Sequence, residues 1–195
     1  MPDTSRAPEL HQVVLLLGSN IEKEKNLPAA LSLLVRSVAV VDLSSVYESR
    51  PSGSRDQPNF FNAAVLVSSS QEPADLKDGL IADIEALLHR VRTTDKYSPR
   101  TIDLDIVLYG DETRDYTPRD GRTRHIPDPD LLKFAHVALP VAELLPRTLH
   151  PETGESMTKI AARLRRKAKS RQDATIWVRP DIDLRPLLED DKATG

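Results

Sequence analysis

The order of apolar segments is the feature of this sequence that most constrains its fold. Short aliphatic runs, typical of buried strands, alternate with longer segments whose apolar residues recur every three or four positions, as in one-sided helices. In chain order the predicted elements are strand, helix, strand, strand, helix and strand, over residues 13–17, 28–37, 40–47, 60–67, 73–91 and 101–109. This is the order of the ferredoxin-like α+β fold, a βαββαβ sandwich in which an antiparallel sheet carries two helices on one face.

The rest of the chain is predicted to be less regular. We expect a charged loop, a short helix, a further helix and a frayed end over residues 111–124, 130–137, 156–169 and 184–195. We divide the chain into an N-terminal arm, a main domain and a C-terminal helical extension, at residues 1–12, 13–165 and 166–195. The basic run RLRRKAKSR at residues 163–171 is typical of a solvated helix face, and a phosphate-rich partner is the alternative interpretation.

Composition excludes several classes of protein. The 195 residues suit one domain, and 39% hydrophobic with 29% charged residues is a globular balance. The formal net charge of -3 provides no general attraction to nucleic acid or to an anionic membrane. The absence of cysteine excludes disulfides, thiolate metal sites and a cysteine nucleophile. No signal-peptide stretch or membrane-length apolar run occurs, so we expect a cytoplasmic protein without membrane or nucleic-acid partners.

Two aspartates interrupt the last predicted strand. Because side chains alternate faces along a strand, the even-numbered residues from Ile102 to Leu108 form an aliphatic face, and Asp103 and Asp105 lie together on the other face with the later odd-numbered residues. Their backbones are then roughly 6.5–7 Å apart, close enough for both carboxylates to hold one ion or bridge two. Aspartates are disfavoured in strands, and like charges on one face repel unless a cation lies between them. The pair therefore indicates a Mg²⁺ site, with an exposed face paired to Arg or Lys as the alternative.

Four cations precede this pair. They are Arg90, Arg92, Lys96 and Arg100. A basic loop that leads into a two-carboxylate strand suits a polyphosphate, whose charge is shared by metal and guanidinium groups. A solvated basic loop is the ordinary alternative. Neither the P-loop motif nor Gly-x-Gly-x-x-Gly occurs, which disfavours both of those nucleotide-binding folds.

These segments together resemble one enzyme family. Leu17-Gly-Ser-Asn20, Asp56-Gln-Pro-Asn-Phe-Phe-Asn-Ala-Ala-Val65, Arg90-Val-Arg92 and Pro99-Arg-Thr-Ile-Asp-Leu-Asp-Ile106 are similar to motifs of 6-hydroxymethyl-7,8-dihydropterin pyrophosphokinase, an enzyme of folate biosynthesis. The resemblance is collinear from about Val13 to Pro151. It implies a ferredoxin-like fold and the transfer of pyrophosphate from Mg-ATP to the pterin hydroxymethyl group, with release of AMP. Pterin and ATP are then the small-molecule ligands, and other folate-pathway enzymes are the candidate partners.

The resemblance also implies roles for particular residues. Asp103 and Asp105 hold two Mg²⁺ ions, and the catalytic set is completed by Arg90 and Arg92 on a loop that closes over the phosphates. The implied nucleotide-side residues are Glu85, Arg92, Arg100, Ile106, His125 and Lys133. The implied pterin-side residues are Ser49, Arg50, Phe60, Asn62, Tyr97 and His136. Taken singly, Asn62 also fits an ordinary strand-end amide and Tyr97 an ordinary loop aromatic.

The sequence departs from the family pattern at three positions. The family usually has Ile-Pro-His-Pro where this chain has Ile126-Pro-Asp-Pro129, and Asp128 cannot donate to phosphate as imidazole does. Phe134 replaces the usual arginine, and His136 replaces the second ring of the pterin sandwich. We hypothesise that His125 and Lys133 partly restore the missing donor and positive charge.

Two alternatives stay open beside an active pyrophosphokinase. Asp128 and Phe134 motivate a related chain that binds pterin or nucleotide but turns over poorly. A ferredoxin-like RNA-binding module is a different class, which requires surface aromatics for base stacking. Aromatic residues make up only 4% of this chain and no strand has the expected basic-aromatic pattern, so RNA binding is disfavoured.

Overall fold

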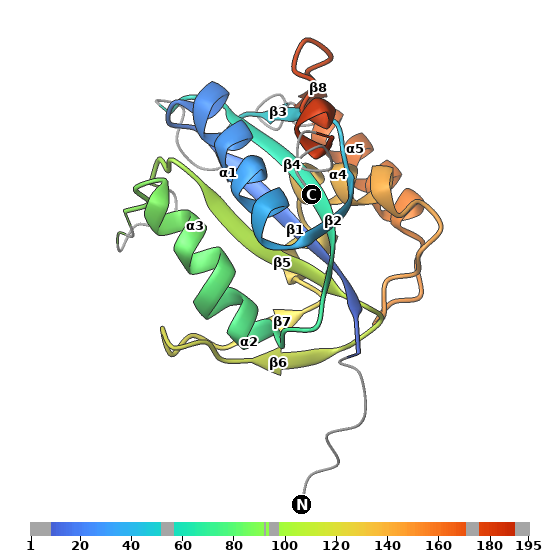
Figure 1. Ribbon diagram of the computed structural model, residues 1–195. Helices are drawn as coiled ribbons and strands as arrows, with labels where there is room; N and C mark the ends of the chain where they lie inside the picture. The colour runs from blue at the N-terminus through green and yellow to red at the C-terminus, as the bar shows by residue number, and fades with distance from the viewer. Residues whose placement is uncertain (1–8, 52–56, 92, 94–97, 171–175, 190–195) are drawn as a thin grey trace, which may run out of the picture.

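A computed structural model describes residues 9–51, 57–91, 93, 98–170 and 176–189 (Figure 1). Its strands are β1 (His11–Ser19), β2 (Ala39–Leu43), β3 (Tyr47–Ser49), β4 (Phe60–Ser69), β5 (Asp103–Tyr109), β6 (Arg114–Tyr116), β7 (Arg124–Ile126) and β8 (Ile176–Val178). Its α-helices are α1 (Lys23–Ser37), α2 (Pro73–Leu76), α3 (Ala82–Leu87), α4 (Ala135–Leu144) and α5 (Met157–Ser170). Short helices of other kinds are η1 (Lys77–Ile81), η2 (Pro129–Leu132) and η3 (Arg185–Leu188).

The main sheet has six strands and is antiparallel at every pairing. Its order is β5-β1-β4-β3-β8, and β2 also pairs with β4. Strands β5, β1 and β4 occupy three of the four positions expected of a ferredoxin-like sheet. Strands β2 and β3, which both pair with β4, share the fourth position, and this order confirms the predicted fold. Strands β6 and β7 form a separate hairpin, so the prediction of a charged loop at residues 111–124 is wrong for β6, and β7 begins at the last residue of that segment and continues to Ile126.

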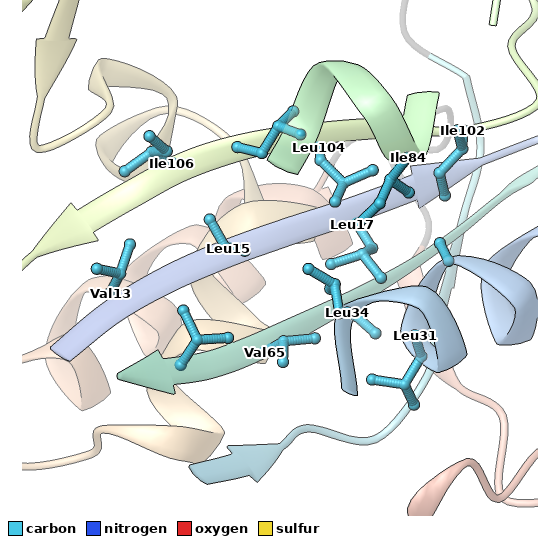
Figure 2. Packing of buried hydrophobic residues seen from close by; sticks show 14 of the residues in the cluster. Val13, Leu15, Leu17, Leu31, Leu34, Val65, Ile84, Ile102, Leu104 and Ile106 are labelled. Carbon is cyan, nitrogen blue, oxygen red and sulfur yellow. The ribbon is translucent and has the colours of Figure 1, made fainter. Parts of the chain in front are cut away.

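Helices cover both faces of this sheet. On one face, α1 and α3 pack on β1, β4 and β5, and Figure 2 shows Leu34 of α1 next to Leu17 of β1. The two helices predicted for one face are therefore present. On the opposite face, α4 and α5 form a second apolar cluster with the sheet. None of the helices in the described ranges combines the length and the apolar character needed to cross a bilayer.

The predicted alternation along β5 is right as far as Val107 and wrong for Leu108 and Tyr109. Leu15 pairs with Ile106 whereas the neighbouring Val14 pairs with Leu108, so Val107 is an extra residue in β5. A bulge of this kind shifts the alternation of side chains by one position. Leu108 therefore packs in the cluster under α4 and α5, and does not continue the aliphatic face of β5.

The helix predicted over residues 73–91 is not continuous in the structure and ends earlier than expected. It is interrupted by the π-helical segment η1, and it stops at Leu87 instead of continuing to Val91. The chain turns away at His89, whose φ of 57° lies in the left-handed region. Arg90 consequently lies beyond the helix, in the segment that leads toward β5.

The C-terminal part belongs to the folded body. Helix α5 runs through the boundary that was predicted at residues 165/166, and β8 adds a strand to the main sheet beside β3. Leu184 is buried in the core between the sheet and α1. The prediction of a frayed end is therefore wrong for residues 184–189, and residues 190–195 lie outside the described part.

Candidate functional site

A cavity of about 550 Å³ opens on the sheet face that carries α4. The end of β5 on one side and the ends of β3 and β4 on the other form two walls of the cavity, β1 lies between them, and η2 with the start of α4 forms a third wall. It brings together nine of the predicted site residues: Ser49, Arg50, Phe60, Asn62, Arg100, Asp103, Asp105, Lys133 and His136. Four strands far apart in the sequence therefore contribute to one site because their ends meet at one end of the sheet.

The aspartate pair lies on the β5 wall of this cavity. Asp103 is held by Arg100, an ion-pair and hydrogen-bond partner three residues before it, and Arg90 lies 3.9 Å from its other oxygen. Burial and the nearby charge of Asp105 raise the pKa of Asp103. Burial also acts on Asp105, but the pairing with Lys77 outweighs it and lowers the pKa of Asp105. The two carboxylates thus share one electrostatic environment and differ in their protein partners.

Lys77 lies beside the aspartate pair and was not among the predicted site residues. Its side chain is 5% exposed, and its ammonium group donates to the Leu104 carbonyl oxygen and to Asp105 Oδ1, the latter at 3.2 Å. Glu85 lies 3.8 Å from the same ammonium group and accepts the Leu104 N–H at 3.1 Å. Lys77 and Glu85 thereby satisfy the backbone of β5 on the side that does not face β1. Lys77, Ile81 and Glu85 recur every four residues, which places them on one face of the predicted helix. This spacing is the sequence pattern that could have indicated that Lys77 lies beside Glu85.

The opposite wall carries neutral polar groups. Asn62 is 3% exposed and Ser49 is 6% exposed. The Asn62 amide nitrogen donates to Ser49 Oγ at 2.9 Å and to the Tyr47 carbonyl oxygen at 3.4 Å. This leaves the carbonyl oxygen of the Asn62 side chain to face the cavity as an acceptor. A buried amide that is held by two neighbours is a rigid recognition group rather than an adaptable one.

Two of the aromatic residues predicted on the pterin side line the cavity, one from β4 and one from α4. Phe60 lines the cavity from β4, and the Arg100 guanidinium lies 5.8 Å from its ring centre. His136 lines the cavity from the first turn of α4 and stacks on Phe134 at 5.3 Å. Burial lowers the pKa of His136 to about 4. Its imidazole is therefore neutral near pH 7 and suited to stacking.

Asp128 also lines the cavity, near the aspartate pair. It accepts the Asp130 N–H at 2.8 Å, and Lys133 pairs with Asp130 at 3.5 Å. Burial, followed by the charges of Asp105 and Asp130, raises the pKa of Asp128 to about 6. At pH 7 this carboxylate adds negative charge to the side of the cavity that was expected to take phosphates.

Several predicted residues lie elsewhere. His125 is not part of the cavity lining, because its ring nitrogens contact Asp115 at 2.6 Å and Glu152 at 2.9 Å. Of the two residues proposed to compensate for Asp128, only Lys133 reaches the cavity. Ile106 is buried in the core on the opposite face of the sheet. Arg92 and Tyr97 lie outside the described residues.

The donor set of the cavity suits a hard cation. Among the described residues, no group of three or more His, Cys, Asp or Glu side chains is arranged to enclose a metal ion. Asp103 and Asp105 supply carboxylate oxygens, and Mg²⁺ characteristically binds through one or two carboxylates while keeping water and substrate phosphate oxygens. The open pair therefore fits an ion that is shared with a polyphosphate better than one enclosed by the protein.

Comparison with known proteins identifies relatives of this chain. A sequence model of the 7,8-dihydro-6-hydroxymethylpterin-pyrophosphokinase (HPPK) family matches residues 14–146. A 2-amino-4-hydroxy-6-hydroxymethyldihydropteridine pyrophosphokinase of Synechocystis sp. is 32% identical over 186 residues, which cover 93% of this chain and 87% of that protein. The protein of the same name from Pseudomonas aeruginosa is 36% identical over 146 residues, covering 73% of this chain and 86% of its own.

Larger proteins contain a similar domain. The Pneumocystis carinii folic acid synthesis protein fol1 is 35% identical over 147 residues, and the match covers only 19% of its length. A Plasmodium falciparum HPPK-DHPS structure superposes with a TM-score of 0.71 at 14% identity, over 87% of this chain and 49% of that one. This likeness shows the shared fold, and the chain spans about half the length of that solved protein. With the family match over more than half of its residues, the chain belongs to the 7,8-dihydro-6-hydroxymethylpterin-pyrophosphokinase family.

Proposed function

We propose that this chain is an ATP-dependent pyrophosphokinase of folate biosynthesis. It transfers the terminal pyrophosphoryl group of ATP to the hydroxymethyl group of 6-hydroxymethyl-7,8-dihydropterin and releases AMP. The observation that carries the proposal is a single cavity with the aspartate pair on one wall and the buried Asn62–Ser49 pair on the other. The charged wall suits a metal-bound polyphosphate, and the neutral wall suits a flat heterocycle with donors and acceptors on its edge.

The neutral wall is proposed to bind the pterin. The Asn62 side-chain oxygen, fixed by its amide donations to Ser49 and Tyr47, accepts from the ring edge. Phe60 and the neutral imidazole of His136 contact the faces of the ring. Backbone groups of Ser49 and Arg50 border the same space. Tyr97 and Arg92 retain their sequence-based roles as proposals, since they lie outside the described part.

The charged wall is proposed to bind ATP and Mg²⁺. Asp103 and Asp105 would hold two Mg²⁺ ions, and these ions would supply charge neutralisation for the phosphates. Arg90, Arg100 and Lys133 supply positive charge beside the carboxylates. Arg100 already pairs with Asp103 in this structure, so its guanidinium lies where it can turn from carboxylate to phosphate.

The reaction then depends on positioning. The pterin hydroxymethyl oxygen attacks the β-phosphorus of ATP and its hydroxyl proton is released to solvent. A new oxygen–phosphorus bond forms, and the bond to the oxygen that bridges the α- and β-phosphates breaks. AMP leaves with that oxygen. No covalent enzyme intermediate is needed, because alignment of the two substrates and stabilisation of charge supply the catalysis.

The cytoplasm, where ATP is available, is the proposed location, and other folate-pathway enzymes remain proposed partners.

Asp128 favours a second candidate, a homologue that binds pterin or nucleotide but turns over poorly. Its carboxyl lines the cavity, and its charge above about pH 6 opposes the binding of phosphate. The RNA-binding alternative has no comparable support, since helices pack on both faces of the sheet that such modules leave open to bases.

Incubation with Mg-ATP and 6-hydroxymethyl-7,8-dihydropterin tests the proposal. The expected products are AMP and the pterin pyrophosphate, without ADP. Tight pterin binding without AMP release would favour the weakened homologue. ADP formation would contradict attack at the β-phosphorus and would indicate transfer of a single phosphoryl group.

A further inference from the structure

We propose that the C-terminal segment of residues 176–189 positions the pterin-binding strand β3, and that Arg179 acts in this as a positioning residue through Glu48. The inference rests on the proposed function of the cavity and extends it to a part of the chain beyond the family match, which ends at residue 146. The segment contains β8, Arg179, the buried Leu184 and η3.

Strand β3 depends on β8 for one of its two neighbours. It has only three residues, Tyr47–Ser49, and lies between β4 and β8 in the sheet. Tyr47 pairs with Val178 and Ser49 with Ile176, and the Arg179 N–H then donates to the Val46 carbonyl oxygen at 2.8 Å. Without β8, a three-residue strand would form the unpaired edge of the sheet beside the cavity.

Arg179 adds a side-chain connection to the same strand. Its guanidinium donates to Glu48 Oε2, and Asp181 holds the other side of the guanidinium at 2.7 and 2.9 Å. The Glu48 side chain is 10% exposed, and its second oxygen accepts from Lys23 at 2.9 Å and from Asn59 at 3.1 Å. Glu48 is therefore a nearly buried anion that joins the C-terminal segment, α1 and the start of β4 to β3.

This connection reaches the cavity through the alternation of β3. Glu48 points to the side of Phe61, whose ring contacts the cations of both Lys23 and Arg179, at 4.2 and 5.1 Å. Ser49, the next residue, points to the cavity and accepts from Asn62. Because adjacent residues on one strand move together, fixing Glu48 from the core side fixes Ser49 on the pterin side.

The segment offers a matched control at its other end. Arg185 donates to the Leu43 carbonyl oxygen at 2.9 Å and lies 3.3 Å from Asp42. These contacts also attach the C-terminal segment to the sheet, but they involve the end of β2, and neither residue lines the cavity. If the segment only stabilises the fold, Arg179→Ala and Arg185→Ala should have similar effects.

The experiment compares the steady-state kinetics and pterin affinity of wild type, Arg179→Ala, Arg179→Lys and Arg185→Ala. Loss of a hydrogen bond to a buried charge is expected to raise KM and Kd for the pterin by about tenfold in Arg179→Ala, with kcat and KM for ATP within about twofold. Arg179→Lys, which keeps the positive charge, should restore most of the pterin affinity. Arg185→Ala should leave both KM values within about twofold.

Two physical readouts separate positioning from loss of folding. Trp177 of β8 is the only tryptophan of the chain, so its emission maximum reports whether β8 remains against β3. Hydrogen exchange at residues 47–49 should rise in Arg179→Ala while exchange in β1 stays at the wild-type level. If Arg179→Ala does not fold, Arg179→Gln takes its place in the same comparisons.

The outcomes are distinct. Equal pterin KM and Kd in wild type, Arg179→Ala and Arg185→Ala would overturn the positioning role while leaving the proposed function intact. A proportional rise of both KM values in the two alanine variants would also overturn it, because the effect would then be general. A wild-type protein that binds no pterin would instead overturn the proposed function, and the positioning role with it.

Discussion

The two walls of the cavity are built on opposite principles. The β5 wall is dense in charge, and each of its aspartates already has a cation partner, Arg100 for Asp103 and Lys77 for Asp105. The β3–β4 wall is neutral where it faces the cavity, and its polar groups are fixed by hydrogen bonds to one another. One wall must exchange partners when a metal-bound polyphosphate enters, and the other can receive a ligand without rearrangement.

Because of this difference, substitutions on the two walls should affect the stability of the fold and the binding of substrates to different extents. The partly buried ion pairs on the β5 wall contribute to folding only while both partners are present, because a charge left without its partner at such a position is unfavourable. Neutral hydrogen bonds on the β3–β4 wall cost less when broken. We therefore expect substitutions on the charged wall to have the larger effects, and those on the neutral wall to be confined to one substrate.

Asp105→Asn should have the largest effect on activity. The amide cannot replace a carboxylate in holding a divalent cation against phosphate, so kcat is expected to fall by about 10³-fold. Pterin affinity should remain within about twofold, since the neutral wall is untouched. AMP release and calorimetric pterin titration measure the two quantities, with the exposed Asp83→Asn as control. Retention of wild-type turnover would show that the aspartate pair is not the catalytic metal site.

Lys77→Met should have the largest effect on stability. Removal of the ammonium group takes away the cation that lies 3.8 Å from the buried Glu85 carboxylate and 3.2 Å from Asp105, and the free energy of unfolding is expected to fall by about 3–5 kcal/mol. Urea denaturation measures the loss. The double variant Lys77→Met with Glu85→Gln should recover much of it, because the amide oxygen still accepts from Leu104 without a buried charge. A double variant as unstable as the single one would mean that Lys77 acts by packing and not by charge.

Asn62→Ala should weaken the binding of pterin alone. It removes the acceptor in the cavity and leaves Ser49 and the Tyr47 carbonyl oxygen without their buried donor. The Kd for the pterin should therefore rise by about 10- to 100-fold. Binding of a non-hydrolysable ATP analogue should be unchanged. Equal losses for both ligands would contradict the assignment of separate walls to the two substrates.

Asp128→Asn should have the smallest effect, and one that depends on pH. The pKa of Asp128 is raised to about 6, so the carboxyl is neutral below that pH and repels phosphate above it. The variant should therefore bind the ATP analogue several-fold more tightly at pH 8 and like wild type at pH 5. An advantage of the same size at both pH values would exclude the charge of Asp128 as its cause.

The same shift has a consequence for stability. The folded protein holds the Asp128 proton more tightly than the unfolded chain does, whose aspartates titrate near 3.8. The stabilisation is therefore complete below about pH 4 and is lost as the pH rises through about 6. The unfolding free energy of wild type minus that of Asp128→Asn should fall across this interval.

The local features of this protein follow from its sequence patterns. The period of two in β5 predicted that Asp103 and Asp105 share a face, and the order of apolar segments predicted the ferredoxin-like sheet. These inferences succeed because side-chain direction along a strand follows from backbone geometry, which needs no information about distant residues. The motifs around Asn62 and Arg100 further indicated the family and the two substrates.

The groups that meet across the fold are set by long-range packing, which no local pattern of the sequence specifies. Lys77 pairs with Asp105 because β5 presents its outer side to the helix that carries Lys77, and the sequence separation conceals this contact. His125 is directed to Asp115 and Glu152 by the β6–β7 hairpin, away from the cavity. The bulge at Val107 and the pairing of β8 with β3 depend on register between strands, which local patterns do not specify. Periodicity sets the direction of a side chain, but long-range pairing chooses its partner.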